Sequence, residues 1–460
     1  MDKDQMHGLT KGYLPVTAFR HLEPTAVGVV DLEQSITPRA PDGRAWSTEQ
    51  RDSLLLIRLH DEPLAVLYLR KPPESFTADE LSAEIWQSAG PEIRQHVERF
   101  DCMQMPTTAD VLVSGLRARP TNCSGRKPTK MKLSTAVIVP TVGREEQLTR
   151  CIRSLLAQRD AEFEVIVVDN RPATGAALRA VSALATEDPR VRYVSEWRGG
   201  SSVARNRGAS ETDADIVAFT DDDVFVDPSW LEWLIAPFSE SAVTASCGMV
   251  LPLELQTEEQ KRFELYGGFS KGIEGHSYDM QNRHTGLLLY PFLGDIFGSG
   301  NSMAFRRADF VAAGGFDPAL GGGSPAQSGE DIYAFSTAIL RGGRLIYEPR
   351  SVCWHQHRRD REALYRQVFD YGVGLGAILT KALFTGGPHF YEAIARSMPV
   401  AFGLVRQKYG SANGDTPDDD ASSDELVHVQ NAGMLRGPWR YAKGVGRTRR
   451  LRLGEAIDHD

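Results

Sequence analysis

The fold follows from residues 134–169, which read STAVIVPTVGREEQLTRCIRSLLAQRDAEFEVIVVD. The apolar run Ala136–Pro140 has the character of a buried strand, and a helical segment, Glu145–Gln158, comes after it. A second apolar run, Phe163–Val168, ends on Asp169. Strand, helix and strand at this spacing predict a right-handed βαβ unit in a parallel sheet, and therefore an α/β fold.

Polar side chains gather where the strands of this domain end. A helix near Ala176–Ala185 leads into a strand at Val191–Val194, and the strand Ile216–Phe219 then runs into three aspartates, Asp221–Asp223. Ligands of an open parallel sheet bind outside the carboxyl ends of its strands. We therefore expect a site at that edge, with candidate side chains on Thr141, Arg144, Asp169 and the aspartate triplet.

The triplet predicts a cation site. Three carboxylates at one strand end repel one another, which disfavours folding unless a cation offsets their charge. Carboxylate oxygens suit Mg²⁺ or Mn²⁺, and such ions take one or two carboxylates together with substrate phosphates. The alternative is a solvated acidic loop. The next pair, Asp227-Pro228, has instead the pattern of a helix start, with Asp at the N-cap.

The chain around this domain divides into smaller parts. Strand patterns at Thr25–Asp31, Ser53–Leu59 and Ala65–Leu69 precede a helix capped by Thr77. Residues 411–425 carry six acidic and no basic side chains, whereas residues 436–452 carry seven basic and no acidic ones. We expect 1–105 to form a small α+β domain, 106–132 a linker, 133–357 the α/β domain, 358–410 a helical extension, 411–425 a disordered linker and 426–460 a basic tail.

The composition is that of a soluble globular protein, with 41% hydrophobic and 25% charged residues among 460. The net charge of -9 argues against nucleic-acid binding, which favours basic surfaces. Five scattered cysteines without metal-ligand spacing fit a reducing cytoplasm. No signal-peptide pattern opens the chain, and no run approaches the roughly 20 apolar residues of a membrane span. We therefore expect a cytoplasmic protein.

Six short motifs resemble those of the family 2 glycosyltransferases with the GT-A fold, over about Ser134–His357. They are Val137-Ile138-Val139-Pro140-Thr141, Glu164-Val165-Ile166-Val167-Val168-Asp169, Ala204-Arg205-Asn206-Arg207-Gly208, Thr220-Asp221-Asp222-Asp223, Gly314-Gly315-Phe316-Asp317 and Gly329-Glu330-Asp331. The resemblance implies a Rossmann-like, mixed and mostly parallel sheet flanked by helices. It also implies an inverting enzyme that uses Mn²⁺ or Mg²⁺ to move one sugar from a nucleoside-diphosphate sugar, such as a UDP-sugar, to a hydroxyl or amine.

The resemblance carries roles onto single residues. Asp331 would be the base that takes the acceptor proton, with Glu330 beside it. Asp223 and His355 would bind the metal, with His357 as the alternative histidine. Donor binding would fall on Pro140, Thr141, Arg144, Asp169, Arg205, Asp221 and Asp222, and the acceptor or sugar pocket on Asp295, Gly300 and Asn301. Tyr333 is a departure, because the family often has another aspartate at that place.

Other functions stay open at this point. A nucleotidylyltransferase would share the sheet but needs a longer glycine-rich loop after the first strand, and a processive polysaccharide synthase needs spanning helices. A non-catalytic sugar-nucleotide-binding or scaffold protein would have no use for Glu330-Asp331. The acceptor is a glycan, a lipid carrier, a peptide or a natural product. The N-terminal domain is a candidate for acceptor binding or homodimer formation, and the basic tail for contact with the inner face of a membrane or with the acidic linker.

Overall fold

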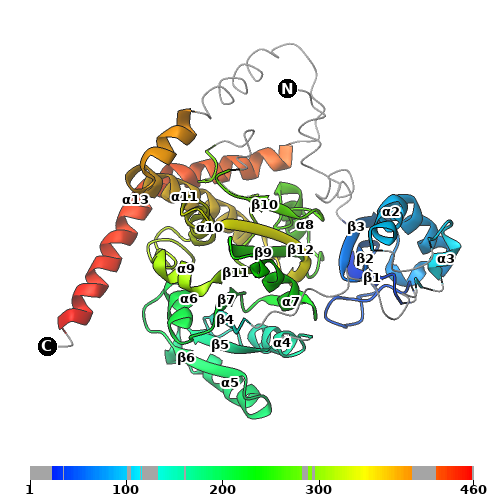
Figure 1. Cartoon of the computed structure of the whole chain (residues 1–460), viewed down its shortest axis with the longest axis horizontal. Coiled ribbons are helices and arrows are strands. Elements are labelled where there is room, and N and C mark those ends of the chain that lie inside the picture. Colours follow the sequence, from blue (N-terminus) through cyan, green and yellow to red (C-terminus); the bar gives the residue numbers. More distant parts are fainter. Residues whose placement is uncertain are drawn as a thin grey trace.

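A computed structural model describes residues 23–34, 36–100, 105–113, 115–116, 133–159, 162–281, 289–292, 296–395 and 421–457. Its centre is a nine-stranded mixed sheet, with strands in the order β10-β12-β9-β11-β7-β4-β5-β6 and β8 paired to β12. Helices cover both faces of this sheet (Figure 1). The predicted α/β class is confirmed.

One half of the sheet is entirely parallel and is built as the apolar runs predict. It comprises β4 (Thr135–Thr141), β5 (Phe163–Asp169), β6 (Val191–Ser195) and β7 (Ile216–Phe219), connected through α4 (Glu145–Leu156), α5 (Ala176–Glu187) and α6 (Ser201–Ser210). Alternate residues of β4 face different cores: Ile138 packs in one buried cluster and Val139 in the other. A strand buried on both faces is apolar throughout, which explains the run. The register places Thr141 opposite Asp169, so β4 and β5 end side by side.

The other half of the sheet is mixed, and it brings the end of β12 close to the aspartate triplet. β11 (Met303–Arg306) runs antiparallel between β7 and β9 (Val243–Pro252), β12 (Arg344–His355) lies parallel to β9, and β10 (His276–Tyr278) pairs with the start of β12. The short strand β8 (Val224–Val226) pairs with the end of β12, His355 opposite Val224. That pairing brings His355 next to the aspartates. The helices of this half are α7 (Trp230–Ile235), α8 (Glu258–Tyr266), α9 (Arg307–Ala312) and α10 (Glu330–Leu340).

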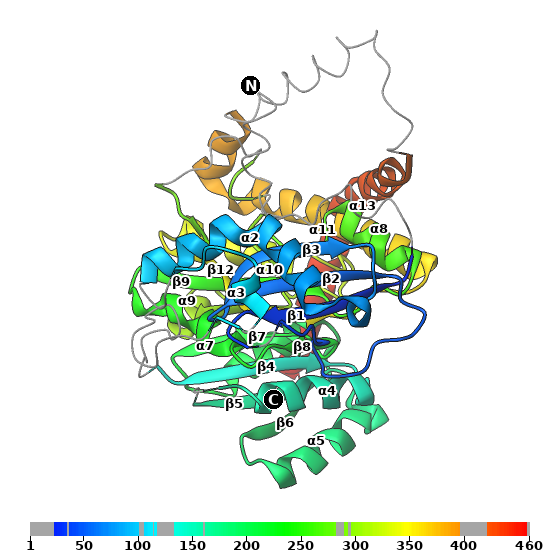
Figure 2. The same ribbon diagram turned by 90° about the vertical axis from the view of Figure 1, so that its right-hand side faces the viewer.

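The N-terminal unit has its own small sheet and core (Figure 2). It contains β1 (Thr25–Asp31), β2 (Asp52–Leu59), β3 (Glu62–Leu69), α2 (Ala78–Phe100) and α3 (Asp110–Val113). The predicted cap of α2 forms: Thr77 Oγ1 accepts from the Glu80 amide at 3.2 Å, and Glu80 Oε2 accepts from the Thr77 amide at 2.9 Å. Buried Arg58 ties the unit to the α/β domain, since its Nη1 lies 2.9 Å from Asp227 Oδ2. Asp227 therefore has a structural role, although α7 begins three residues later, at Trp230.

Two long helices complete the described chain: α11 (Arg361–Thr385) and α13 (Ala421–Ile457). They cross at very short range, because a Cβ added at Gly372 would lie 1.9 Å from the Gln430 carbonyl oxygen and one at Gly433 2.1 Å from that of Phe369. Glycine alone permits this approach. The α13 helix and the N-terminal unit lie on opposite sides of the α/β domain (Figure 1).

One expectation about this region needs correction. Residues 421–425 of the expected disordered linker are the first turn of α13, and the basic tail is helical as far as Ile457, because packing on α11 stabilises it; residues 411–420 lie outside the described part.

The α11 helix is long and apolar enough to cross a membrane by length and composition alone, with 44% of the relevant stretch buried inside the protein. A core helix of a globular protein passes the same test, so the expectation of no membrane span stays a prediction.

Candidate active site

A cleft of about 760 Å³ lies outside the carboxyl ends of β4 and β7, where the strand pattern places a site. Most of the expected site residues line it: Pro140, Thr141, Arg144, Arg205, Asp221, Asp222, Asp223, Gly300, Asn301, Glu330, Asp331 and His355. These residues come from strands, helices and loops that lie far apart in the chain. The first and the last of them, Pro140 and His355, are 215 positions apart. Asp295 lies outside the described residues.

Asp169, which we expect among the donor-binding residues, does not line the cleft. It is fully buried below the cleft, where its Oδ1 accepts from the Arg171 amide and its Oδ2 from the Tyr193 hydroxyl, each at 2.9 Å. The residue that lines the cleft here is its neighbour, Asn170. The Asn170 amide group donates to the Arg198 carbonyl at 2.8 Å and its oxygen accepts from the Gly200 amide at 2.7 Å, so it shapes the loop before α6.

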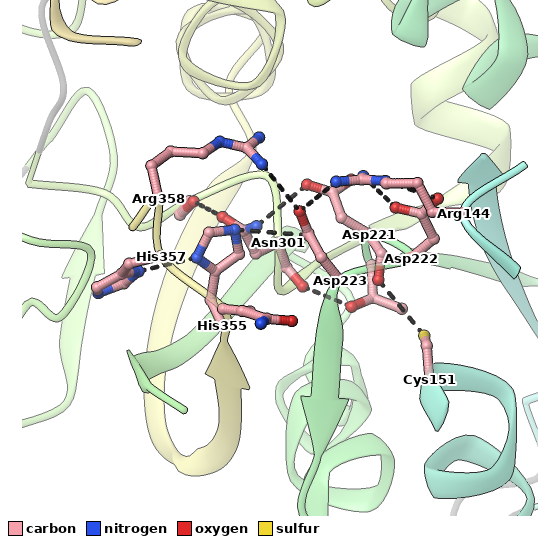
Figure 3. Close-up of polar contacts among 12 residues, drawn as sticks. Arg144, Cys151, Asp221, Asp222, Asp223, Asn301, His355, His357 and Arg358 are labelled. Atoms are coloured by element: carbon pink, nitrogen blue, oxygen red, sulfur yellow. Dashed lines mark hydrogen bonds and ion pairs between the residues drawn. The ribbon is translucent and has the colours of Figure 1, made fainter. Parts of the chain in front are cut away.

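Asp222 and Asp223 are almost completely buried, and arginine offsets their charge (Figure 3). The Arg144 guanidinium contacts both: Nη1 lies 2.8 Å from Asp223 Oδ2, and Nη2 bonds Asp222 Oδ1. Thr141 Oγ1 donates to the second oxygen of Asp222 at 2.6 Å. Burial nevertheless raises the pKa of Asp222 to about 6, against the opposing effect of Arg144. Asp222 and Asp223 are thus buried and paired with a cation, so this end of the triplet is not a solvated loop.

Asp221 points toward the other side of the cleft. Arg205 Nη2 lies 2.6 Å from its Oδ1, while Arg205 Nη1 lies 2.6 Å from Glu330 Oε1. Arg205 is itself only 3% exposed, so its two carboxylate partners offset the cost of burying the cation. This bridge joins the triplet to the start of α10. Asn301 Nδ2 adds a bond of 3.1 Å to Asp221 Oδ2.

Asp331 opens α10 at the far wall of the cleft. Its Oδ2 accepts from the Gly300 amide and its Oδ1 from the Ile332 amide, each at 2.8 Å. Burial, reinforced by the charge of Glu330, raises the pKa of Asp331 to about 6. A carboxyl group with this pKa is mostly ionised at neutral pH and is a stronger base than an ordinary aspartate. Each oxygen keeps a further lone pair for a substrate hydroxyl.

His355 faces Asp223 from the end of β12 (Figure 3). Its Nε2 lies 3.5 Å from Asp223 Oδ1, close enough for both atoms to contact one cation, since such ions bind oxygen and nitrogen at about 2.1 Å. Within the described ranges no three or more His, Cys, Asp or Glu side chains cluster as a complete metal site. A pair of protein ligands still fits Mg²⁺ or Mn²⁺, which complete their coordination with water and phosphate oxygens. His357 turns away from the triplet toward Glu264.

Sequence reasoning missed part of the cleft wall. Gln367, Asp370 and Tyr371 of α11 line the cleft opposite the strand ends, together with Arg366. The signal that could have found them is the polar stripe at positions 366, 367 and 370 of a largely apolar helix. Tyr333 lies outside the cleft wall: its hydroxyl is 3.3 Å from Thr385 Oγ1, and Lys381 Nζ lies 3.9 Å from its ring centre.

Comparison with known proteins gives four findings. The family described as Glycosyl transferase family 2 matches residues 136–310. The chain is 25% identical over 251 residues to a glucosyl-dolichyl phosphate glucuronosyltransferase of Haloferax volcanii, covering 53% of this chain and 73% of that one. It is 28% identical over 174 residues to a pre-mycofactocin glycosyltransferase of Mycobacterium tuberculosis, covering 38% of this chain but only 33% of the relative. A mannosyltransferase from Pyrobaculum calidifontis, solved with GDP-Man and Mn²⁺, superposes with a TM-score of 0.44 at 17% identity, covering 69% of this chain and 87% of that one.

Proposed function

We propose that this chain is an inverting, metal-assisted glycosyltransferase that adds a single sugar to a hydroxyl or amine. The match of the Glycosyl transferase family 2 model to residues 136–310 and the similarity to a glucuronosyltransferase support this proposal. The donor is a nucleoside-diphosphate sugar. The groups for its diphosphate are Arg144, Arg205 and the aspartate triplet, and the base is Asp331.

One observation carries this proposal: two adjacent residues hold the opposite halves of the site together. The Gly300 amide donates to Asp331, and the Asn301 side chain donates to Asp221. A carboxylate base and a cation-demanding carboxylate are therefore held on two sides of one cleft. An in-line displacement needs this separation, because the attacking and leaving groups occupy opposite faces of the sugar carbon.

The proposed reaction gives each of these side chains a role. The acceptor oxygen attacks the anomeric carbon as its proton passes to Asp331, and the bond from that carbon to the donor phosphate oxygen breaks. The electron pair leaves with the nucleoside diphosphate. In this proposal Arg144 and Arg205 stabilise the negative charge that develops there, since a guanidinium donates to two phosphate oxygens together. A divalent cation beside Asp223 and His355 would supply further charge stabilisation for the leaving group.

A thermal-shift screen tests the proposal directly. The full chain is heated with a panel of nucleoside-diphosphate sugars, each with and without Mn²⁺. We expect at least one donor to raise the melting temperature, and Mn²⁺ to increase that shift, because a ligand that binds only the folded state stabilises it. Absence of a shift with every donor, or a shift that Mn²⁺ leaves unchanged, would contradict the proposed donor site or its metal.

The outer face of α13 supports peripheral contact with an anionic membrane surface. Leu435 is 82% exposed and Trp439 63%, and basic side chains flank them at Arg436 and Lys443. Arg447 makes a different contact, donating to the Gly323 carbonyl at 2.9 Å, so part of the tail rests on the α/β domain. Co-sedimentation with phosphatidylserine vesicles at low and high salt tests the contact. We expect the wild type to sediment with the vesicles more than a Leu435→Ser/Trp439→Ser variant does. Equal recovery of the two proteins in the supernatant would contradict the membrane contact.

A further inference from the structure

Behind the candidate metal ligands lies a buried row of three hydrogen-bonded side chains. His355 Nδ1 is 2.9 Å from His357 Nδ1, and His357 Nε2 is 2.5 Å from Glu264 Oε1 on α8. All three residues are at most 9% exposed. The row begins at Asp223 Oδ1, which faces His355 Nε2, and leads away from the cleft (Figure 3).

The acceptor at the end of this row determines which nitrogen of each ring carries a hydrogen. An ionised carboxylate only accepts, so Glu264 requires the hydrogen of His357 on Nε2. A neutral imidazole has one donor and one acceptor nitrogen, so His357 Nδ1 is an acceptor. The hydrogen between the two rings therefore belongs to His355 Nδ1. His355 Nε2 is left with a lone pair, and this lone pair is directed at Asp223.

The rings that pack against the row hold both imidazoles in one orientation. The Phe269 ring packs edge-on against His355, with 5.0 Å between ring centres and planes at 81°. The Phe263 ring packs similarly against His357, at 4.8 Å. Neither imidazole can rotate without losing these contacts.

His355 Nε2, with its lone pair, thus faces the carboxylate oxygen Oδ1 of Asp223 at 3.5 Å inside the protein. Both atoms are hydrogen-bond acceptors. Arg144 bonds the other oxygen of Asp223, Oδ2. Two acceptors that face each other are unfavourable unless a cation lies between them. Hydrogen bonds from the outer nitrogen of a metal-binding histidine to a second acceptor are a general means of orienting such ligands.

We propose that His357 and Glu264 are positioning residues, which hold His355 in the tautomer that presents Nε2 to a divalent cation beside Asp223. The inference rests on the metal-assisted function proposed above and extends it to two residues outside the cleft wall. Neither residue touches the donor or the acceptor. Their contribution is to metal affinity, not to the chemical step.

The test measures Mn²⁺ binding to the full chain by calorimetry, with UDP and GDP in parallel, and nitrogen coupling to bound Mn²⁺ by pulsed electron paramagnetic resonance. We expect the wild type to bind Mn²⁺ with an imidazole ¹⁴N coupling. His357→Phe keeps the aromatic packing but removes the acceptor for His355 Nδ1, so we expect affinity to fall about 10- to 100-fold. His357→Asn retains an acceptor oxygen near the Nδ1 position and should stay close to the wild type.

The chain offers a matched control. In the N-terminal unit, buried His96 lies between Glu62 and His60, with Nδ1 2.7 Å from Glu62 Oε2 and Nε2 3.0 Å from His60 Nδ1. His96→Phe removes the same chemistry away from the cleft and should leave Mn²⁺ affinity unchanged. Melting curves establish that each variant is folded. Should His357→Phe fail to fold, Glu264→Met takes its place, because it removes the acceptor for His357 Nε2 at a similar volume, and again weaker Mn²⁺ binding is expected.

The outcomes separate the two proposals. A wild type that binds no Mn²⁺ with either nucleotide contradicts the metal-assisted function itself. Mn²⁺ binding without a nitrogen coupling leaves that function standing and overturns the role of the row. Wild-type affinity in folded His357→Phe, or in Glu264→Met where it is the variant measured, overturns it as well.

Discussion

Arg144 Nη1 lies 2.8 Å from Asp223 Oδ2, and this contact joins the loop after β4 to the last aspartate of the triplet. The same guanidinium also contacts Asp222. One arginine therefore offsets the charge of two carboxylates that would otherwise be buried without a cation. Arg144 and a bound metal would offset the same negative charge of the aspartates. The loss of one should therefore make the protein depend more on the other.

Replacement of Arg144 by Met should destabilise the protein and make its stability more dependent on metal. Two buried carboxylates lose their cationic partner, which we expect to cost about 1–3 kcal/mol because Arg144 is partly exposed. Mn²⁺ should raise the melting temperature of the variant more than that of the wild type. Differential scanning fluorimetry measures both shifts, and an equal Mn²⁺ effect in the two proteins would contradict the shared-charge argument.

Asp331→Asn should abolish most transfer while donor binding survives. The amide occupies the same volume but cannot take the acceptor proton, so we expect kcat to fall about 10²- to 10⁴-fold. The donor identified by thermal shift should bind within a few-fold of its wild-type Kd. Asp188→Asn, which alters an exposed pair with Arg190, serves as the control. Full turnover in Asp331→Asn would remove this residue from the base role.

The pH profile of transfer should report the same carboxyl group. Because burial raises the pKa of Asp331 to about 6, the base is protonated below that pH and ionised above it. The transfer rate should therefore rise with pH and level off above about 7. Well below pH 6 it should fall tenfold for each unit that the pH is lowered. Initial rates of kcat/KM between pH 4.5 and 8 provide the measurement. A limb centred near 4, the ordinary value for aspartate, would contradict the effect of burial.

Arg58→Met should lower the stability of the protein without changing its affinity for the donor. Arg58 is buried between Asp31 and Asp227, so its loss leaves Asp227 as an unpaired buried charge, and we expect a loss of about 3–5 kcal/mol in unfolding free energy. Arg39 contacts the same Asp31 from the surface, so Arg39→Met should cost under about 1 kcal/mol. Urea denaturation compares the two. KM for the donor should be unchanged in both, and similar losses in both would show that burial is not the deciding factor.

The fold and the place of the site were predictable from local patterns. The runs at Ala136–Pro140 and Phe163–Val168 are apolar because both faces of their strands are covered, and that cause is visible in the residues themselves. The cap at Thr77 and the start of α10 at Glu330 depend on neighbours within three or four positions. Carboxyl ends of parallel strands share one edge, so Arg144 and the triplet had to lie close together.

Pairing between distant residues was decided only by the tertiary structure. Asp169 stands at the right strand end but is buried against Tyr193, whereas Asn170 lines the cleft, and a one-residue difference of this kind depends on loop conformation. Glu264 meets His357 across 93 positions because α8 packs against the end of β12. The basic tail packs as a helix on α11, and glycines at the contact allow the two backbones to come close. No local pattern in the sequence specifies this contact. By itself the sequence determined which groups stand at the sheet edge, since alternation and strand ends are local properties. Tertiary packing decided which partner each group takes, since hydrogen-bond geometry depends on elements that are far apart in the chain.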